Sequence, residues 1–164
     1  MAKAKQEKTN AMRLLDRAGV SYEALTYPAD PVPTGQEVAA MTGQDPARVF
    51  KTLVTTGRSG EHYVFVIPVT GSLDLKKAAK AAGEKAVEML PQRELLNLTG
   101  YVHGGCSPVG MKKAFSTVVD QSAELLDQIC FSGGRVGLQL RIDRADLRKA
   151  FPHKTADILK EENE

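Results

Sequence analysis

Lys51 is the residue whose type and position most clearly suggest chemistry. It lies inside the apolar run of residues 49–54, where strand alternation places it on the same face as Val49 and Leu53. The opposite face of the run is apolar too. An unpaired buried ammonium is costly unless its pKa falls. Lys51 therefore either reaches into a cavity or extends to water from an edge strand, and the pattern alone leaves both open.

The glycine-rich segment Gly104-Gly105-Cys106-Ser107-Pro108 is the second candidate. Glycines let a backbone approach a ligand closely and can present N–H donors to an oxyanion, as acyl-transfer sites do. Gly and Pro also build ordinary turns, so the segment is either part of a site or a connection. No nucleophile elbow, phosphate-binding loop or dinucleotide motif is present, and serine-triad and nucleotide-dependent chemistry have no support.

A cysteine nucleophile is an alternative, with Cys106 attacking and His103 as its base. Residues three apart in a loop need not reach hydrogen-bonding geometry, which weakens this hypothesis. Cys106 and Cys130 are too few for a disulfide scaffold, and His62, His103 and His153 lack metal-ligand spacing. The sequence therefore predicts free thiols, no bound metal and no cofactor.

Five lysines flank these segments in the sequence and could follow a phosphate backbone if the fold brings them to one rim: Lys76, Lys77, Lys80, Lys112 and Lys113. Otherwise they form a solvated surface. The net charge of +2 permits contact with a polyanion without requiring it. Aromatic residues make up 5% of the chain, which favours recognition of shape or backbone over stacking of many bases.

The elements that must hold these residues follow from periodicity and turn signals. Helices are predicted at 10–18, 34–43, 74–82, 91–97 and 144–151. Strands are predicted at 21–27, 49–56, 62–69, 115–119, 128–131 and 136–142, with a hairpin turn at 57–60.

Capping residues sharpen the helix predictions. Thr34 and Glu37 form a capping-box pattern, and Asp143 is expected to cap the last helix. In the helix at 74–82 the expected buried stripe consists of Leu75, Ala78, Ala79 and Ala82.

Some predicted strands follow one another as hairpins and others are separated by helices. This order predicts the α+β class, with one curled, mixed, barrel-like sheet surrounded by helices. The 164 residues suit one domain over 1–164, with tails at 1–8 and 160–164 that should fray. Charged residues make up 26% and hydrophobic ones 42%, as in an ordinary globular protein. No secretory leader or membrane-spanning run is visible, and a cytoplasmic protein is expected.

Several motifs carry a family resemblance, in this chain order: Phe50-Lys51-Thr52-Leu53, Leu73-Asp74-Leu75-Lys76-Lys77-Ala78, Val87-Glu88-Met89, Gly100-Tyr101-Val102, Gly104-Gly105, Ser107-Pro108, Gly110, Lys112-Lys113 and Ser132-Gly133-Gly134. With these motifs the sequence resembles the bacterial Cys-tRNA(Pro) deacylases of the YbaK/EbsC type. That family is related to the inserted editing domain of prolyl-tRNA synthetase.

The resemblance implies a trans-editing hydrolase that removes cysteine mischarged onto tRNA(Pro). A second hydrolytic site is needed because a synthetase pocket discriminates poorly among small side chains. In the implied mechanism the cysteinyl thiol attacks its own ester, so the enzyme positions the substrate and stabilises charge without a nucleophile of its own. The implied partners are the aminoacylated tRNA 3′ end and a complex with prolyl-tRNA synthetase, with no membrane or DNA.

The resemblance also assigns roles to residues. Lys51 matches the essential lysine, and Gly104 the backbone group beside the reacting carbonyl. The substrate-binding candidates are Tyr27, Thr34, Gly105, Ser107, Pro108, Ser132 and Gln139.

Three departures bear on the substrate. Thr34 replaces a family aromatic, Gln139 replaces an acidic residue, and the usual basic pair after the glycines is reduced to Arg135-Val136. Another substrate, such as Ala-tRNA(Pro), or a non-catalytic tRNA- or synthetase-binding module of the same fold is therefore kept as an alternative.

Overall fold

The structure is a computed structural model that describes residues 7–161. Its helices are α1 (Asn10–Arg17), α2 (Gly35–Met41), α3 (Leu75–Ala82), α4 (Leu95–Thr99) and α5 (Leu147–Ala150). Short 3-10 turns lie at Pro46–Arg48, Gln92–Glu94, Gln121–Leu125 and Arg144–Asp146. The strands are β1 (Glu23–Thr26), β2 (Phe50–Gly57), β3 (His62–Pro68), β4 (Val87–Met89), β5 (Ser116–Asp120), β6 (Gln128–Ser132), β7 (Leu138–Asp143) and β8 (Lys154–Ala156).

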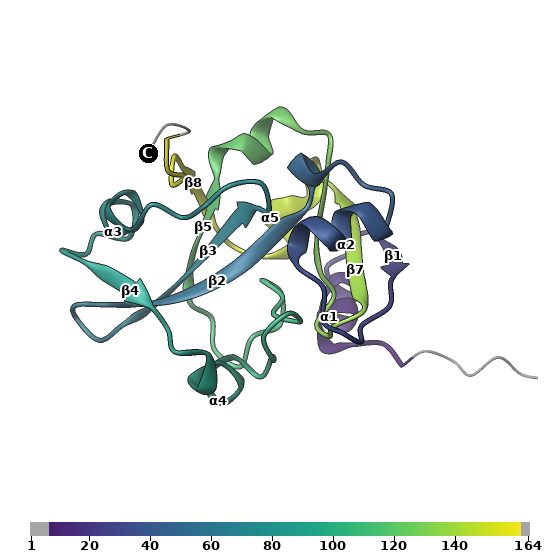
Figure 1. The fold of residues 1–164 in the computed structure, drawn as a ribbon, viewed down its shortest axis with the longest axis horizontal. Coiled ribbons are helices and arrows are strands. Elements are labelled where there is room, and N and C mark those ends of the chain that lie inside the picture. Colours follow the sequence, from purple (N-terminus) through teal and green to yellow (C-terminus); the bar gives the residue numbers. More distant parts are fainter. Residues whose placement is uncertain (1–6, 162–164) are drawn as a thin grey trace, which may run out of the picture.

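The strands form two sheets (Figure 1). The smaller is antiparallel, in the order β1-β7-β6. The larger has the order β4-β2-β3-β5-β8, antiparallel from β4 to β3 and parallel from β3 to β8. An isolated parallel bridge between Val49 and Cys130 joins them. The predicted α+β class is confirmed, whereas the single barrel-like sheet is corrected to two open sheets, because only this bridge continues the pairing from β2 to β6.

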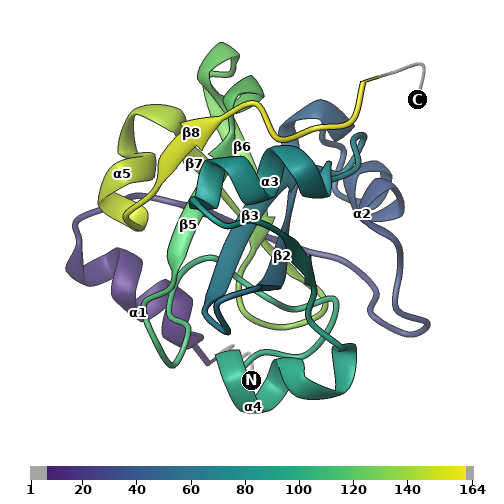
Figure 2. The ribbon, with the colours of Figure 1, turned by 90° about the vertical axis from the view of Figure 1, so that its left-hand side faces the viewer.

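The two faces of the larger sheet bury different clusters. One face, with Phe50, Val64 and Val66, packs against the smaller sheet, α1 and α5 in the main core. The other face, with Phe65 and Ile67, packs against α3, which lies across β2 and β3 in Figure 2. A third small cluster joins α2 to the junction between the sheets. The junction is therefore fixed by packing on several sides.

Most predicted helix signals are confirmed. Thr34 and Glu37 form the capping box, and Asp74 caps α3 by accepting hydrogen bonds from the backbone N–H groups of Lys76 and Lys77. Asp143 does not cap the last helix, because its carboxylate accepts a hydrogen bond from Gln128 instead.

The buried stripe predicted for α3 is wrong in one residue, and the fraying of the tails stays a prediction. Leu75 is 40% exposed and leaves the predicted buried stripe, in which Ala78 and Ala79 are buried. Of the tails expected to fray, residues 1–6 and 162–164 lie outside the described part of the chain. The Lys8 ammonium bonds to Asp16 at 2.5 Å, and the Lys160 N–H donates to the Ser72 carbonyl at 3.0 Å.

Candidate active site

A cavity of about 250 Å³ lies at the junction of the two sheets. Its walls come from the start of β2, the N-terminal end of α2, Leu95 of α4, the glycine-rich loop, and the facing ends of β6 and β7. Five of the sequence-predicted site residues line it: Thr34, Lys51, Gly104, Ser132 and Gln139. Side chains from positions more than 100 residues apart therefore meet in one hollow.

The cavity exists because one edge of β2 is open there. The short β4 pairs only with Thr55 to Gly57, and the chain then leaves β2 after the Leu90 N–H has donated to the Val54 carbonyl at 3.0 Å. The first half of β2 pairs with β3 alone. Backbone and side chains of residues 50–53 consequently border the hollow rather than another strand.

Lys51 is half-buried and borders this cavity. Among the described lining residues it is the one Lys, Arg, Asp or Glu. Within residues 7–161 its ammonium has no hydrogen-bond or ion-pair partner. Of the two positions that the sequence left open, the structure favours the cavity. A free cation at a small hollow is suited to stabilise negative charge on a bound group.

The glycine-rich loop supplies one side of the cavity. Gly104 has a φ of +86° and lies exposed at the rim, a conformation that favours glycine. At Gly105 a Cβ would come within 2.9 Å of the Arg135 Cα, so the absence of a side chain lets the loop pack against the segment after Gly134. The loop is thereby held in place beside β2.

Two other residues of the loop that were predicted to bind substrate lie away from the Lys51 cavity. Ser107 is fully buried, and its hydroxyl accepts a hydrogen bond from the Val109 N–H at 3.2 Å. Pro108 lines a different hollow, beside Leu14 and Phe115. Neither Ser107 nor Pro108 borders the Lys51 cavity, and the structure does not bring them to the predicted site.

Cys106 borders the cavity but is a poor nucleophile. Its side chain is only 8% exposed, and burial raises the pKa of the thiol to about 12, an effect that Thr99 opposes only in part. Because the thiolate is the reactive form, a neutral thiol of this kind does not attack an ester at neutral pH. His103 also lines the cavity, but within the described chain no hydrogen bond joins it to the Cys106 thiol, whose hydrogen-bond partner is Thr99.

The far wall carries small polar groups. Thr34 accepts the Glu37 N–H as a helix cap, and the Ser132 hydroxyl accepts the Gly134 N–H at 3.1 Å. Gln139 is 7% exposed, and its Oε1 is buried without a hydrogen-bond partner. The side chain of Tyr27 does not line the cavity, although its N–H donates to the Gly137 carbonyl and holds the turn before β7.

Thr52 and Leu95 line the cavity but were not predicted from the sequence. Leu95 lies in a helix without a marked pattern. Thr52 looks like an ordinary β-strand residue, and its distinguishing property is three-dimensional: its Oγ1 is buried without a hydrogen-bond partner. The signal that could have identified it is its place directly after Lys51.

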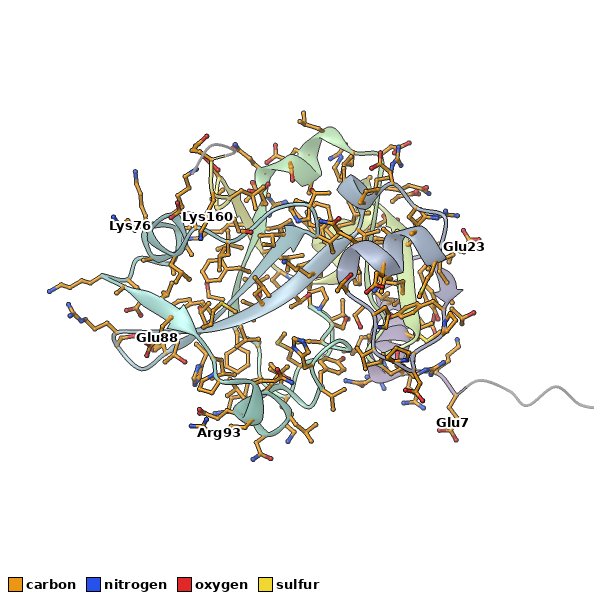
Figure 3. The ribbon with its side chains drawn as sticks, viewed as in Figure 1. Glu7, Glu23, Lys76, Glu88, Arg93 and Lys160 are labelled. Atoms are coloured by element: carbon orange, nitrogen blue, oxygen red, sulfur yellow. The ribbon has the colours of Figure 1, made fainter. Side chains whose placement is uncertain are left out.

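The five predicted lysines do not gather on one rim. Lys76, Lys77 and Lys80 belong to α3, which lies well apart from α4 in both ribbon views (Figures 1 and 2). In Figure 3, Lys76 lies at the upper left and Arg93, in the turn before α4, at the lower left. Lys77 is engaged with Asp157, Glu161 and the Leu159 carbonyl. Lys112 instead bonds the Asn97 carbonyl of α4, on the side of the cavity.

A small α+β domain with a lysine-bearing cavity between two open sheets defines the class, and comparisons with known proteins identify the family. Residues 29–150 match the model of the aminoacyl-tRNA editing domain. The chain is 44% identical over 144 residues to EbsC of Enterococcus faecalis, which is named as a Cys-tRNA(Pro)/Cys-tRNA(Cys) deacylase; the match covers 87% of this chain and 88% of that protein.

Solved structures agree on the fold. The hypothetical protein APE2540 superposes with a TM-score of 0.84 at 26% identity, over 93% of this chain and 100% of that one. A protein described as a trans-editing enzyme for prolyl-tRNA synthetase gives 0.83 at 24% identity, over 95% and 100%. The chain belongs to the aminoacyl-tRNA editing domain family and is an enzyme of the deacylase class. None of its described helices has the length and apolar character needed to cross a membrane.

Proposed function

We propose that this protein hydrolyses Cys-tRNA(Pro) in trans, in the cytoplasm, and that Lys51 and the Gly104 loop form its catalytic site. The observation that carries the proposal is that Lys51, whose ammonium has no partner among residues 7–161, lines a small cavity beside that loop. The 44% identity to a protein named as a Cys-tRNA(Pro)/Cys-tRNA(Cys) deacylase supports the choice of substrate.

The size of the cavity suits a small aminoacyl group. Its volume of about 250 Å³ lies below the range of roughly 300–1,000 Å³ that is usual for drug-sized ligands. Val49, Phe50, Val69 and Leu95 give it apolar walls. A cysteinyl side chain can be enclosed there, while the terminal ribose remains at the open rim near Gly104.

The reaction requires no protein nucleophile. The cysteinyl sulfur forms a bond to its own ester carbonyl carbon, and the bond from that carbon to the ribose oxygen breaks. The thiol proton is lost, the ribose oxygen gains a proton, and water then opens the released thiolactone to cysteine. Lys51 stabilises the developing negative charge, together with backbone N–H groups of the Gly104 loop, while the cavity holds sulfur and carbonyl close together.

Deacylation of purified Cys-tRNA(Pro) by the wild type and Lys51→Ala tests the proposal. Removing one charge-stabilising group costs about 10²- to 10³-fold in rate in comparable sites, and we expect a loss of that size. Lys80→Ala on α3 is the matched control and should retain the wild-type rate. Equal rates for wild type and Lys51→Ala, or an inactive but folded wild type, contradict the proposal.

The choice of substrate is tested on a panel of Cys-tRNA(Pro), Cys-tRNA(Cys), Ala-tRNA(Pro) and Ser-tRNA. Attack by the substrate thiol predicts that only the cysteinyl species are cleaved. Ala-tRNA(Pro) is the second candidate, because Thr34 and Gln139, which depart from the family residues, both line the cavity. Its cleavage at a comparable rate would exclude a mechanism that depends on the substrate thiol.

Recognition of tRNA(Pro) is proposed to use the α4 side of the molecule and a complex with prolyl-tRNA synthetase. Lys112 is the lysine of the predicted set that bonds to α4, whose Leu95 borders the cavity. Lys112→Ala should raise KM for charged tRNA with little change in kcat, whereas Lys80→Ala should not. Addition of the synthetase should lower KM if the complex delivers the substrate.

A further inference from the structure

The open edge of β2 presents backbone groups to the cavity. The Val49 carbonyl accepts the Val69 N–H at 2.8 Å, toward β3, and the Val54 carbonyl accepts the Leu90 N–H on the opposite side. Peptide groups alternate in direction along a strand, so Phe50 and Thr52 direct their N–H and C=O groups away from β3. β4 begins its pairing only at Thr55, and β6 reaches this edge at the isolated bridge between Val49 and Cys130, beside Phe50. Within the described chain no strand pairs with the outward groups of Thr52.

Two residues that line this cavity each carry a side-chain oxygen that is buried without a hydrogen-bond partner. They are Thr52 on β2, through Oγ1, and Gln139 on β7, through Oε1. A buried polar group without a hydrogen bond costs roughly 1–3 kcal/mol, and such groups in native proteins call for an explanation. The explanation consistent with their position is that a ligand supplies the missing donors.

The polarity of the cavity restricts the identity of that ligand. Lys51 is a cation that suits an oxyanion or carbonyl oxygen, whereas Gln139 Oε1 and the outward carbonyl of Thr52 accept hydrogen bonds, as the Thr52 hydroxyl also can. The outward Thr52 N–H is a donor. Thr52 also points to the opposite face of β2 from Lys51, which separates the acceptors from the cation. An ammonium group carries several donors at one atom and can satisfy such a set, whereas a thiol is a weak donor.

We propose that Thr52, with Gln139 and the open edge of β2, binds the free α-ammonium group of the aminoacyl substrate. This inference rests on the proposed function, because it places an amino acid in the Lys51 cavity. It adds a requirement that neither the lysine nor the substrate thiol explains: a substrate whose α-amino group is acylated should be refused. With the ammonium held at the acceptors, the ester carbonyl is directed toward Lys51 and Gly104.

The test uses binding, so that it does not depend on turnover. The probes are 3′-cysteinylamino-3′-deoxyadenosine, a non-hydrolysable amide analogue of the charged 3′ end, and its N-acetyl derivative. N-acetylation removes the charge and leaves the thiol intact. Because a hydrogen bond to a charged group accounts for about 10- to 100-fold in affinity, we expect the wild type to bind the free-amino analogue tighter by that factor in titration calorimetry.

Variants at Thr52 assign the preference to this residue. Thr52→Val removes the hydroxyl and should reduce the preference for the free-amino analogue about tenfold, with little effect on the N-acetyl analogue. Thr52→Ser keeps the hydroxyl and should retain the preference. Thr52→Val should also fold at least as stably as the wild type, because it replaces an unpartnered hydroxyl on a β-strand with a methyl group.

Two results overturn this inference. One is a wild type that binds both analogues with equal affinity or binds neither. The other is a Thr52→Val variant that loses the same factor for both analogues, which indicates a general packing role. The deacylation assay of the proposed function is a separate measurement, so an enzyme that hydrolyses Cys-tRNA(Pro) but binds both analogues equally refutes the ammonium site alone.

Discussion

At the scale of single residues, the state of Cys106 decides between two mechanisms. Its buried thiol has a pKa of about 12, so the fraction of thiolate at neutral pH is negligible. We expect Cys106→Ala to deacylate within about threefold of the wild type, since the substrate supplies its own thiol. Steady-state deacylation of Cys-tRNA(Pro) by both proteins measures this, and loss of activity in a well-folded Cys106→Ala would restore the cysteine mechanism.

Of two neighbouring residues at the cavity, Lys51 could be identified as a candidate from the sequence and Thr52 could not. A lysine within an apolar strand is visible in the sequence because its type conflicts with its surroundings, and the cavity explains the conflict. Thr52 carries no such conflict, because threonine is common in strands. Its hydroxyl lacks a partner because of where β4 ends and where β7 lies, and both are set by contacts between residues far apart in the sequence. The roles of both residues remain predictions until the variants are measured.

At the scale of elements, two aspartates that precede helical turns differ in the structure. Asp74 accepts hydrogen bonds from two backbone N–H groups at the start of α3, whereas Asp143 caps nothing. We expect Asp74→Ala to lower the free energy of unfolding by about 1 kcal/mol and Asp143→Ala by clearly less. Urea denaturation of both variants measures this, and equal losses would contradict the structural difference.

Some elements could not be predicted from the sequence because they have no local signal. The hairpin of β2 and β3 and the capped helices α2 and α3 have local signals, namely a polar turn and capping residues, and their predictions are confirmed. β4 and β8 are only three residues long, and each is defined by a strand distant in the sequence. The division into two sheets has no local signal either, because it depends on which edges remain unpaired.

At the scale of the whole molecule, the two sheets share one core, so we propose that they unfold as a single unit. Phe131 of β6 is fully buried in this core and packs edge-on against Phe151, with ring centroids 6.0 Å apart. Phe131→Ala should lower the free energy of unfolding by roughly 3–5 kcal/mol with a single transition retained. Leu125→Ala, at an 88% exposed position, is the control and should be nearly neutral. Two separate transitions would contradict a shared core.

Protonation of His153 should link the stability of the whole molecule to pH. Burial lowers the pKa of His153 below its usual 6.5 and Arg148 acts in the same direction, although a hydrogen bond to the Phe151 carbonyl partly opposes them. The unfolded chain therefore binds this proton more readily than the folded one. The contribution of His153 to stability is complete above the unfolded pKa of about 6.5 and is lost as pH falls through the lower folded pKa.

We therefore expect the free energy of unfolding to decrease between pH 7.5 and pH 5.5, and His153→Gln to reduce that decrease. Carboxylates with lowered pKa values, such as Glu37 and Asp127, titrate below about pH 4.5 and do not contribute in this window. Urea unfolding of wild type and His153→Gln at the two pH values measures the difference. An identical pH dependence in the two proteins would show that the half-buried imidazole near Phe151 does not couple protonation to folding.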